Sequence, residues 1–241
     1  MNTQNFVWLA ADYHFPTTYS CRVPMSSQHS ALAMPAPGPA TIRLAVVRTG
    51  IELYGIDKVR VELFPIIRAA EIWVKPPERV AISSQLIRAY KAGTNKANSN
   101  EELRGSLSYR EFCHAEGSMT VYMKVPLDYE DAIKEILEGV GYWGQANSLA
   151  CCIRTSRSMP KVGDFAIPLR SLGPAQSIQR FFACIVSDFR STTVKWDEIM
   201  PDVLDPNRKG LGGLLLELYL WPMIISEQHS GGKLLVYRSL N

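Results

Sequence analysis

The chain has 241 residues, of which 46% are hydrophobic, and its 26 Lys and Arg against 23 Asp and Glu give a formal net charge of +3. This length allows one large domain or two small ones, with enough apolar residues for a core that needs no metal or disulfide. A charge so close to balance excludes a protein that binds nucleic acid by bulk charge alone, so any such binding must depend on local patches.

The first part of the chain predicts a strand, an irregular loop and a helix. Residues 5–13 are rich in Phe, Val, Trp and Leu, which is typical of a strand. Residues 16–39 hold five prolines and predict an irregular loop. Residues 41–54 place apolar side chains at helical spacing and stop at Gly55, which predicts a helix that begins near Pro39.

The next part predicts strands and an inserted arm. Residues 60–76 mix β-branched and apolar side chains and predict one or two strands. Residues 79–117 are polar and carry many basic side chains, with a glycine- and asparagine-rich stretch at 93–100. This pattern indicates two extended segments joined by a flexible crown, either as a projecting hairpin or as an interrupted helical arm.

The pattern then returns to regular elements. Residues 118–125 alternate between apolar and polar side chains, which predicts a strand. Residues 129–138 carry an apolar stripe behind Asp128, which predicts a helix capped by that residue. Residues 148–154 are short and apolar, and predict a strand buried on both faces. Further strands are expected at residues 180–188, 214–225 and 233–238.

The order of these elements predicts the fold class. Strand, helix, strand, strand, helix, strand is the βαββαβ arrangement of a ferredoxin-like module, which also underlies the RNA-recognition module. We therefore expect an α+β protein with this module at residues 1–155 and an inserted arm at about 79–117. A strand-rich C-terminal half, residues 156–241, is expected to pack on the module.

The loop at residues 139–145 is a candidate RNA-binding element. Its glycines would let a phosphate backbone approach closely, and Tyr142 and Trp143 could stack on bases beside Gln145. The alternative is that the glycines only form the turn and that the aromatic side chains fill the core.

Basic residues supply the other candidates. Arg43 and Arg48 could line a groove beside the proline-rich loop and contact phosphates, or they could lie on a solvated helix face. The same alternatives hold for the basic residues of the arm. The candidates there are Arg88, Lys91, Arg104 and Arg110.

Catalytic and metal-binding patterns are missing from the sequence. His14 or His29 could in principle activate a 2′-hydroxyl and cleave RNA, but a single histidine in a loop has no chemical role in most proteins. The sequence contains no CxxC pair, no GxSxG and no phosphate-binding glycine loop. We therefore predict no catalytic residue, no metal and no cofactor.

The cysteines and the hydropathy pattern indicate a cytoplasmic protein. The five cysteines are odd in number, and Cys151 and Cys152 are adjacent in an apolar run, so we expect reduced core thiols. The N-terminal stretch lacks the basic start of a signal peptide. The longest apolar run, residues 211–225, contains Glu217 and Pro222 and is too short to span a membrane, so no membrane partner is expected.

Several short stretches within residues 1–155 have the pattern of a known family. They are Tyr19-Ser20, PAPGPATIR at 35–43, LYG at 53–55, AEIWVKPP at 70–77, and GYWGQ at 141–145 ahead of Ser148-Leu149. They resemble the fifth Cas protein family, the RAMP-superfamily subunit of type I CRISPR Cascade complexes. The second half of the chain matches no motif of that family.

The resemblance implies a non-catalytic subunit that caps the 5′ handle of the CRISPR RNA (crRNA). It also implies contacts with the Cascade backbone subunit and large subunit, indirect contact with target DNA, and a thumb-like arm over the guide, for which residues 79–117 are the candidate. One subfamily cleaves precursor RNA with a Tyr, Lys and His set, which no motif here places on numbered positions. Two alternatives stay open: a metal-independent endoribonuclease using His14 or His29, and a module that bridges protein subunits without RNA contact.

Overall fold

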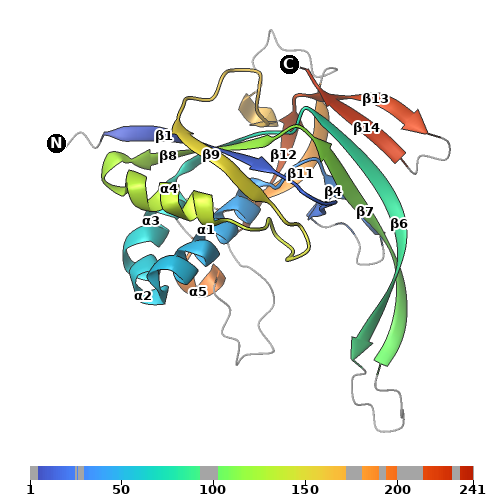
Figure 1. Cartoon of the computed structure of the whole chain (residues 1–241), viewed down its shortest axis with the longest axis horizontal. Helices are drawn as coiled ribbons and strands as arrows, with labels where there is room; N and C mark the ends of the chain where they lie inside the picture. The colour runs from blue at the N-terminus through green and yellow to red at the C-terminus, as the bar shows by residue number, and fades with distance from the viewer. Residues whose placement is uncertain are drawn as a thin grey trace.

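The computed structural model describes residues 5–24, 26, 30–92, 103–171, 181–189, 194–199, 214–229 and 234–240. At its centre lies a four-stranded antiparallel sheet with the strand order β5-β8-β1-β9 (Figure 1). The strands are β1 (Phe6–His14), β5 (Glu71–Lys75), β8 (Met119–Pro126) and β9 (Cys151–Arg157).

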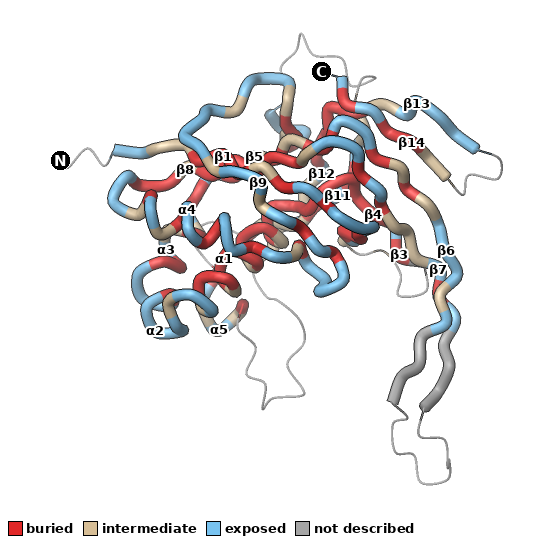
Figure 2. Tube along the Cα trace, in the orientation of Figure 1, coloured by how far each residue is buried: buried red, intermediate tan, exposed pale blue. Residues whose placement is uncertain are grey.

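Two helices cover one face of this sheet and enclose the core. These are α1 (Pro39–Tyr54) and α4 (Glu130–Gly139), and their inward sides are buried (Figure 2). Ile133, Ile136 and Leu137 of α4 are fully buried, and α4 packs on β1, β8 and β9. The predicted order β1, α1, β5, β8, α4, β9 is confirmed, as is the packing of α4 on the 118–125 strand.

The ends of α1 follow the sequence closely. Gly38 precedes the helix, and Pro39 occupies its first turn, where a missing N–H leaves no hydrogen bond unmade. Gly55 ends it with a φ of +81°, a left-handed conformation that glycine adopts without strain, and its N–H donates to the carbonyl of Ile51 at 2.9 Å. The predicted helix is confirmed.

The start of α4 differs from the prediction. A short 3₁₀ turn, η2 (Leu127–Tyr129), precedes the helix and contains Asp128. Tyr129 occupies the capping position and makes no side-chain capping bond, so Asp128 is not the cap. Its carboxylate still lies near the positive end of the helix dipole, together with the acidic residues of the first turn.

The prediction of strands from residue 60 onward is wrong up to residue 69. This stretch is helical and comprises α2 (Ile56–Lys58), the π-helical turn η1 (Val59–Leu63) and α3 (Phe64–Ala69). Val59, Leu63 and Ile67 follow one another at intervals of four and are almost fully buried. That spacing places them on one helix face, and their burial outweighs the β-propensity of the branched side chains.

The arm at residues 79–117 is a hairpin. Its strands, β6 (Arg79–Ala92) and β7 (Leu103–Glu116), pair antiparallel along their whole length and project from the body (Figure 1). Of the two predicted forms, the projecting hairpin is confirmed. The predicted crown at 93–100 lies outside the described residues.

The base of the arm belongs to a five-stranded sheet of order β13-β14-β6-β7-β3. Its outer members are β3 (Ser30–Ala31), β13 (Met223–His229) and β14 (Leu234–Ser239). A three-stranded sheet, β10-β12-β11, lies beside α1 and contains β10 (Ile167–Pro168), β11 (Phe182–Phe189) and β12 (Leu214–Trp221).

The remaining described elements are short: β2 (Cys21–Arg22), β4 (Ala33–Met34), the 3₁₀ turn η3 (Leu169–Ser171) and α5 (Trp196–Ile199). The described residues between 16 and 39 are irregular apart from β2, β3 and β4, and residues 33–40 are buried. The strands predicted in the C-terminal half are present in its described parts, although Pro222 divides the expected 214–225 strand into β12 and β13.

Two expectations about burial fail at β9. This strand is the edge of its sheet and is largely exposed, so it is not buried on both faces. Cys151 is exposed and is therefore not a core thiol, whereas Cys21, Cys113 and Cys184 are buried, and all five cysteines are free. Among the described residues, no helix has the length and apolarity needed to cross a membrane.

Candidate nucleic-acid interface

The structure brings together Arg48 of α1 and Tyr142 of the loop that follows α4. The guanidinium carbon of Arg48 lies 3.4 Å from the centre of the Tyr142 ring, and its Nη2 donates to the Tyr142 carbonyl at 3.3 Å. Contact at this distance is a close cation–π stack. The side chain of Arg48 keeps 26% of its surface exposed, and Tyr142 is half-buried.

A short chain of backbone hydrogen bonds shapes the loop. The N–H of Trp143 donates to the carbonyl of Ser148 at 3.1 Å, and the N–H of Ala150 donates to that of Gly141 at 3.0 Å. Gly144 has a φ of +74°, which a residue with a side chain rarely adopts. The loop thus turns back sharply and presents Tyr142 to α1, with Gln145 exposed at its tip.

A hollow of about 300 Å³ opens where the loop faces the helix. It is lined by Thr41, Leu44, Ala45, Arg48, Tyr142 and Gly144. It offers one cation, one aromatic ring and the Thr41 hydroxyl. Single-stranded nucleic acid is held by this combination of cations for phosphates and flat groups on which bases stack.

Glu52 moderates the charge of this site. One of its carboxylate oxygens lies 3.6 Å from Nε of Arg48, one helical turn away, and its side chain is 61% exposed. An exposed pair of this kind is worth only about 0.2–1 kcal/mol. A phosphate could therefore replace Glu52 as the partner of Arg48 at small cost.

Arg43 does not belong to this interface, which corrects the prediction. It is 4% exposed and forms an ion pair with Asp188 of β11, with Nε 2.8 Å from Oδ1. Its Nη1 donates to the carbonyls of Ile67 and Ala70, at the C-terminal end of α3. Because these internal acceptors occupy the guanidinium, Arg43 neither lines a groove nor lies on a solvated face.

Contrary to the prediction from the sequence, Trp143 does not lie where it could stack on a base. It is fully buried, and its ring meets the edge of Tyr13 at 4.9 Å between ring centres and 81° between planes. For this residue the alternative holds, in which the aromatic side chain fills the core. Of the two aromatic residues predicted to stack on bases, Tyr142 is therefore the one that remains a candidate.

The basic residues of the arm are spread along the hairpin. Arg88 is exposed, and Arg110 is half-buried with an Nε that has no hydrogen-bond partner among the described residues. Lys91 and Arg104 lie opposite each other in the β6–β7 register, and their side chains lie outside the described part.

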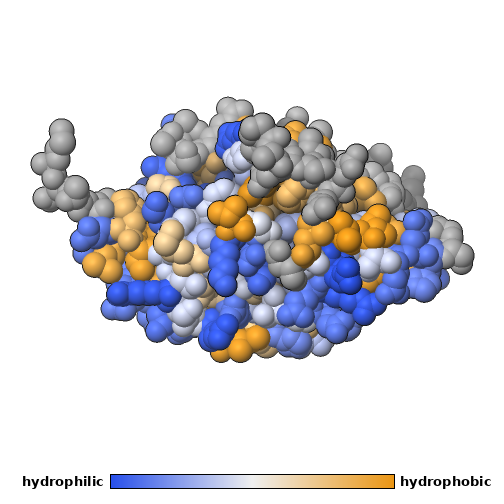
Figure 3. All heavy atoms as spheres, turned by 90° about the horizontal axis from the view of Figure 1, so that it is seen from above, coloured by the Kyte–Doolittle hydropathy of each residue, from blue (hydrophilic) through white to orange (hydrophobic). Residues whose placement is uncertain are grey.

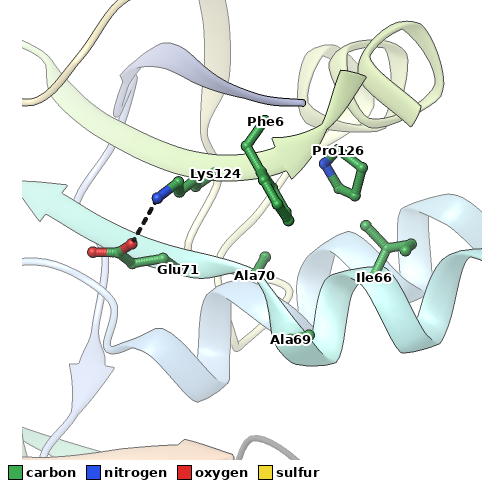
Figure 4. Close-up of a pocket in the computed structure, with 7 residues that line it drawn as sticks. All are labelled: Phe6, Ile66, Ala69, Ala70, Glu71, Lys124 and Pro126. Carbon is green, nitrogen blue, oxygen red and sulfur yellow. Dashed lines mark ion pairs between the residues drawn. The ribbon is translucent and has the colours of Figure 1, made fainter. Parts of the chain in front are cut away.

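A second hollow, of about 320 Å³, lies at the end of the central sheet (Figure 4). Phe6, Ile66, Glu71, Lys124 and Pro126 are among the residues that line it. Lys124 is the one cation among the residues that line it, and it pairs with Glu71 at 3.8 Å. The Glu71 carboxylate would therefore repel a phosphate that approached Lys124. This hollow is less suited to nucleic acid than the one beside Tyr142.

The histidines in the described part of the structure do not lie together in one site. His14 is exposed at the end of β1 opposite Cys151, His114 is exposed on β7, and His29 lies outside the described residues. Burial raises the pKa of the Tyr13 phenol well above its usual value, so this group stays protonated. No group of three His, Cys, Asp or Glu among the described residues could hold a metal ion.

The sequence missed Thr41, Leu44, Ala45 and Glu52 as neighbours of the site. The signal was present, because positions 41, 44, 45, 48 and 52 follow the three-to-four-residue spacing of a single helix face. No local sequence pattern indicates that this helix face contacts Tyr142, which lies 94 residues after Arg48.

A comparison with curated proteins identifies a relative. Over 196 residues the chain is 29% identical to the CRISPR-associated protein Cas5 of Archaeoglobus fulgidus, a match that covers 80% of this chain and 84% of that protein. The chain is a homologue of Cas5. The resemblance that the short N-terminal motifs indicated is thereby confirmed. No family model matches the chain.

Solved structures of CRISPR proteins overlap weakly with this chain. A crystal structure of a CRISPR protein from Archaeoglobus fulgidus gives a TM-score of 0.46 at 12% identity, covering 98% of this chain and 92% of that one. A chain in a CRISPR RNA-guided surveillance complex gives 0.37 at 10% identity, with 89% and 88% covered. A chain in the Type III-B Cmr-β complex bound to cognate target RNA gives 0.48 at 9% identity, with 63% and 60% covered. The homology rests on the sequence relative.

Proposed function

We propose that the chain is an RNA-binding subunit of a type I CRISPR effector complex, Cascade, that caps the 5′ handle of crRNA without cleaving it. Its first 155 residues would form the ferredoxin-like RAMP module with the arm as thumb, and residues 156–241 would pack on that module. Its partners would be the crRNA, the backbone subunit and the large subunit, with target DNA contacted indirectly. The Cas5 relative supports this assignment.

The observation that carries the proposal is the stack of Arg48 on Tyr142 at the rim of the hollow. A guanidinium held over an aromatic ring is pre-organised, so little conformational entropy is lost when it binds. Its planar face can stack on an unpaired base, and its N–H groups can reach a phosphate. The glycines of the loop leave room for the RNA backbone beside them.

The test is binding of repeat-derived 5′-handle RNA to the purified chain, measured by fluorescence anisotropy at several salt concentrations. Arg48→Ala should weaken binding about tenfold and reduce the slope of log affinity against log salt by about 0.7, the value for one phosphate contact on a single strand. Arg60→Ala removes the same charge from an exposed residue that does not line the hollow, and serves as the matched control.

The outcomes separate the alternatives. Equal losses for Arg48→Ala and Arg60→Ala would show binding by general charge and refute the site. Cleavage of the same RNA without metal would show that the chain is an endoribonuclease. If the chain enters the effector complex but has no affinity for the handle RNA, it acts as a protein-bridging module.

A further inference from the structure

Two short motifs of the sequence, Tyr19-Ser20 and Ser148-Leu149, are joined by hydrogen bonds in the structure. The Ser148 hydroxyl accepts the N–H of Ser20 at 3.1 Å and donates to the Ser20 carbonyl at 3.4 Å. The two serines are 128 positions apart in the sequence. Their contact places the loop that follows α4 beside the base of the arm (Figure 1). We call this pair of hydrogen bonds the serine contact.

Ser148 is buried although it is polar. Hydrophilic side chains cover much of the face shown in Figure 3, whereas Ser148 is 0% exposed and Ser20 is 8% exposed. A buried hydroxyl costs free energy unless it is hydrogen-bonded, and the serine contact gives the Ser148 hydroxyl both a donor and an acceptor. A side chain with no exposed surface cannot touch RNA, so any effect of Ser148 on RNA binding must act through another residue.

The backbone of Ser148 closes the loop that carries Tyr142. Its N–H donates to the Gln145 carbonyl at 2.9 Å, and its carbonyl accepts the N–H of Trp143 at 3.1 Å. Tyr142 precedes Trp143 in the chain and forms a backbone bridge with Leu149, the neighbour of Ser148. A shift of Ser148 would therefore carry the Tyr142 ring with it.

The other side of the serine contact is fixed to the arm. The Ser20 hydroxyl donates to the carbonyl of Glu111 in β7 at 2.9 Å. Tyr19 and Cys113 of β7 exchange two backbone hydrogen bonds, of 2.9 and 2.7 Å. Tyr19 is 1% exposed, so its side chain belongs to the core. The segment that holds the loop is thus itself held by the core and by a long strand.

We propose that Ser148 and Ser20 are positioning residues for RNA binding, which hold the loop to the base of the arm at the place where Tyr142 meets Arg48. The inference rests on the proposed function, because that function assigns the RNA site to Arg48 and Tyr142. Arg48 is placed by the regular backbone of α1, whereas Tyr142 lies in a loop and needs support from outside it. Without the serine contact the loop would spend less time in position, and the apparent affinity for RNA would fall in proportion.

Binding of 5′-handle RNA to the full chain tests the role of Ser148. Ser148→Ala should weaken binding about fivefold, a loss in the range of one hydrogen bond. Ser108→Ala is the matched control and should change the affinity by less than about twofold, because Ser108 is 8% exposed and its hydroxyl has no partner among the described residues. In the Tyr142→Ala background, Ser148→Ala should have no further effect. Wild-type affinity of Ser148→Ala, or additive losses in the double variant, would overturn the proposal.

Ser20→Ala tests the link to the arm. It removes the hydroxyl that donates to Glu111 and keeps the backbone N–H that donates to Ser148. We expect an affinity between those of Ser108→Ala and Ser148→Ala, and an affinity equal to that of Ser108→Ala would show that Ser20 does not position the loop. If Ser148→Ala does not fold, Ser148→Cys takes its place with the same expected direction, because a thiol forms weaker hydrogen bonds.

A spectroscopic measurement tests the position of Tyr142 without RNA. The residue p-trifluoromethylphenylalanine replaces Tyr142 in the full chain, and its fluorine NMR resonance reports whether Arg48 lies over the ring. Ser148→Ala should move this resonance toward its position in Arg48→Ala, whereas Ser108→Ala should not. An unchanged resonance in Ser148→Ala would contradict the proposal. If the wild-type chain does not bind handle RNA, the proposed function fails, and the resonance still decides whether Ser148 positions Tyr142.

Discussion

Arg43 and Asp188, 145 residues apart in sequence, form an ion pair that joins α1 to β11. The same guanidinium donates to two carbonyls at the end of α3, where the helix dipole is negative. Arg43→Ala would leave Asp188 and both carbonyls without this partner. Because Asp188 is a fifth exposed, we expect a loss of about 3 kcal/mol in the free energy of unfolding, the lower end for breaking a buried pair.

Urea unfolding of the purified chain measures this loss. Arg48→Ala, from the same helix, is the control and should cost clearly less than Arg43→Ala, because its pair with Glu52 is exposed and its stack on Tyr142 is only half-buried. If Arg43→Ala has wild-type stability but binds RNA more weakly, Arg43 does contact the RNA, contrary to our interpretation.

Trp143 should matter for stability rather than for RNA binding. Its side chain is fully buried against Tyr13, so Trp143→Ala should cost about 3–5 kcal/mol. Nε1 of Trp143 has no hydrogen-bond partner among the described residues, so Trp143→Phe should cost clearly less. Thermal unfolding compares the two, and equal losses would show that the core needs the whole indole and that a smaller ring does not replace it.

Tyr142 should matter through its ring rather than its hydroxyl. Stacking on an aromatic ring contributes about 1–3 kcal/mol per base, and the ring also holds Arg48 in place. Tyr142→Phe should bind handle RNA as wild type does, and Tyr142→Ala should bind at least fivefold more weakly. Loss of binding in Tyr142→Phe would mean that the hydroxyl contacts the RNA.

Glu130 makes a pH-dependent contribution to stability. Arg157 donates hydrogen bonds to its carboxylate, which lowers the pKa of Glu130 below its usual 4.5. A lowered pKa means that the carboxylate stabilises the folded state above its unfolded pKa and that this contribution disappears as pH falls through the folded pKa. The gap in melting temperature between wild type and Glu130→Gln should therefore shrink below about pH 4.5. Glu62→Gln, at an exposed residue of η1, should show no such gap.

The connection between the arm strands should be needed for assembly rather than for folding. Ala92 and Leu103 pair in the register, so residues 93–102 can be replaced by the two-residue turn Asn-Gly, which suits a hairpin. We expect little change in thermal midpoint and reduced assembly on guide RNA in a native gel. If the shortened variant assembles as well as wild type, residues 93–102 do not contact a partner in the complex.

The sequence predicts most of the central module, because its elements have local signals. The alternation at 118–125 and the apolar stripe at 129–138 depend only on neighbouring residues. The helical turn at 59–63 contradicts the predicted strand because branched side chains favour strands in isolation, whereas the packing of Val59 and Leu63 depends on the tertiary core.

The candidate site is only half predictable for the same physical reason. The sequence marks both Tyr142 and Arg48 as candidates, but nothing local indicates that they stack on each other. The partners of Arg43, which are Asp188 and the end of α3, come from distant segments, so its burial is invisible in the pattern around it. The exposure of β9 depends on its place at the sheet edge, which only topology decides.

The pairing of β14 with β6 sets the order in which the arm can be completed. Residues 79–83 of β6 are paired on one side by β7 but on the other by residues 234–238, which leave the ribosome much later. Until then Val80 and Ile82, buried in the finished sheet, lie beside an unpaired strand edge. Such an edge is a template for pairing with other chains. A translation product that stops before β14 is therefore expected to aggregate through the base of its arm.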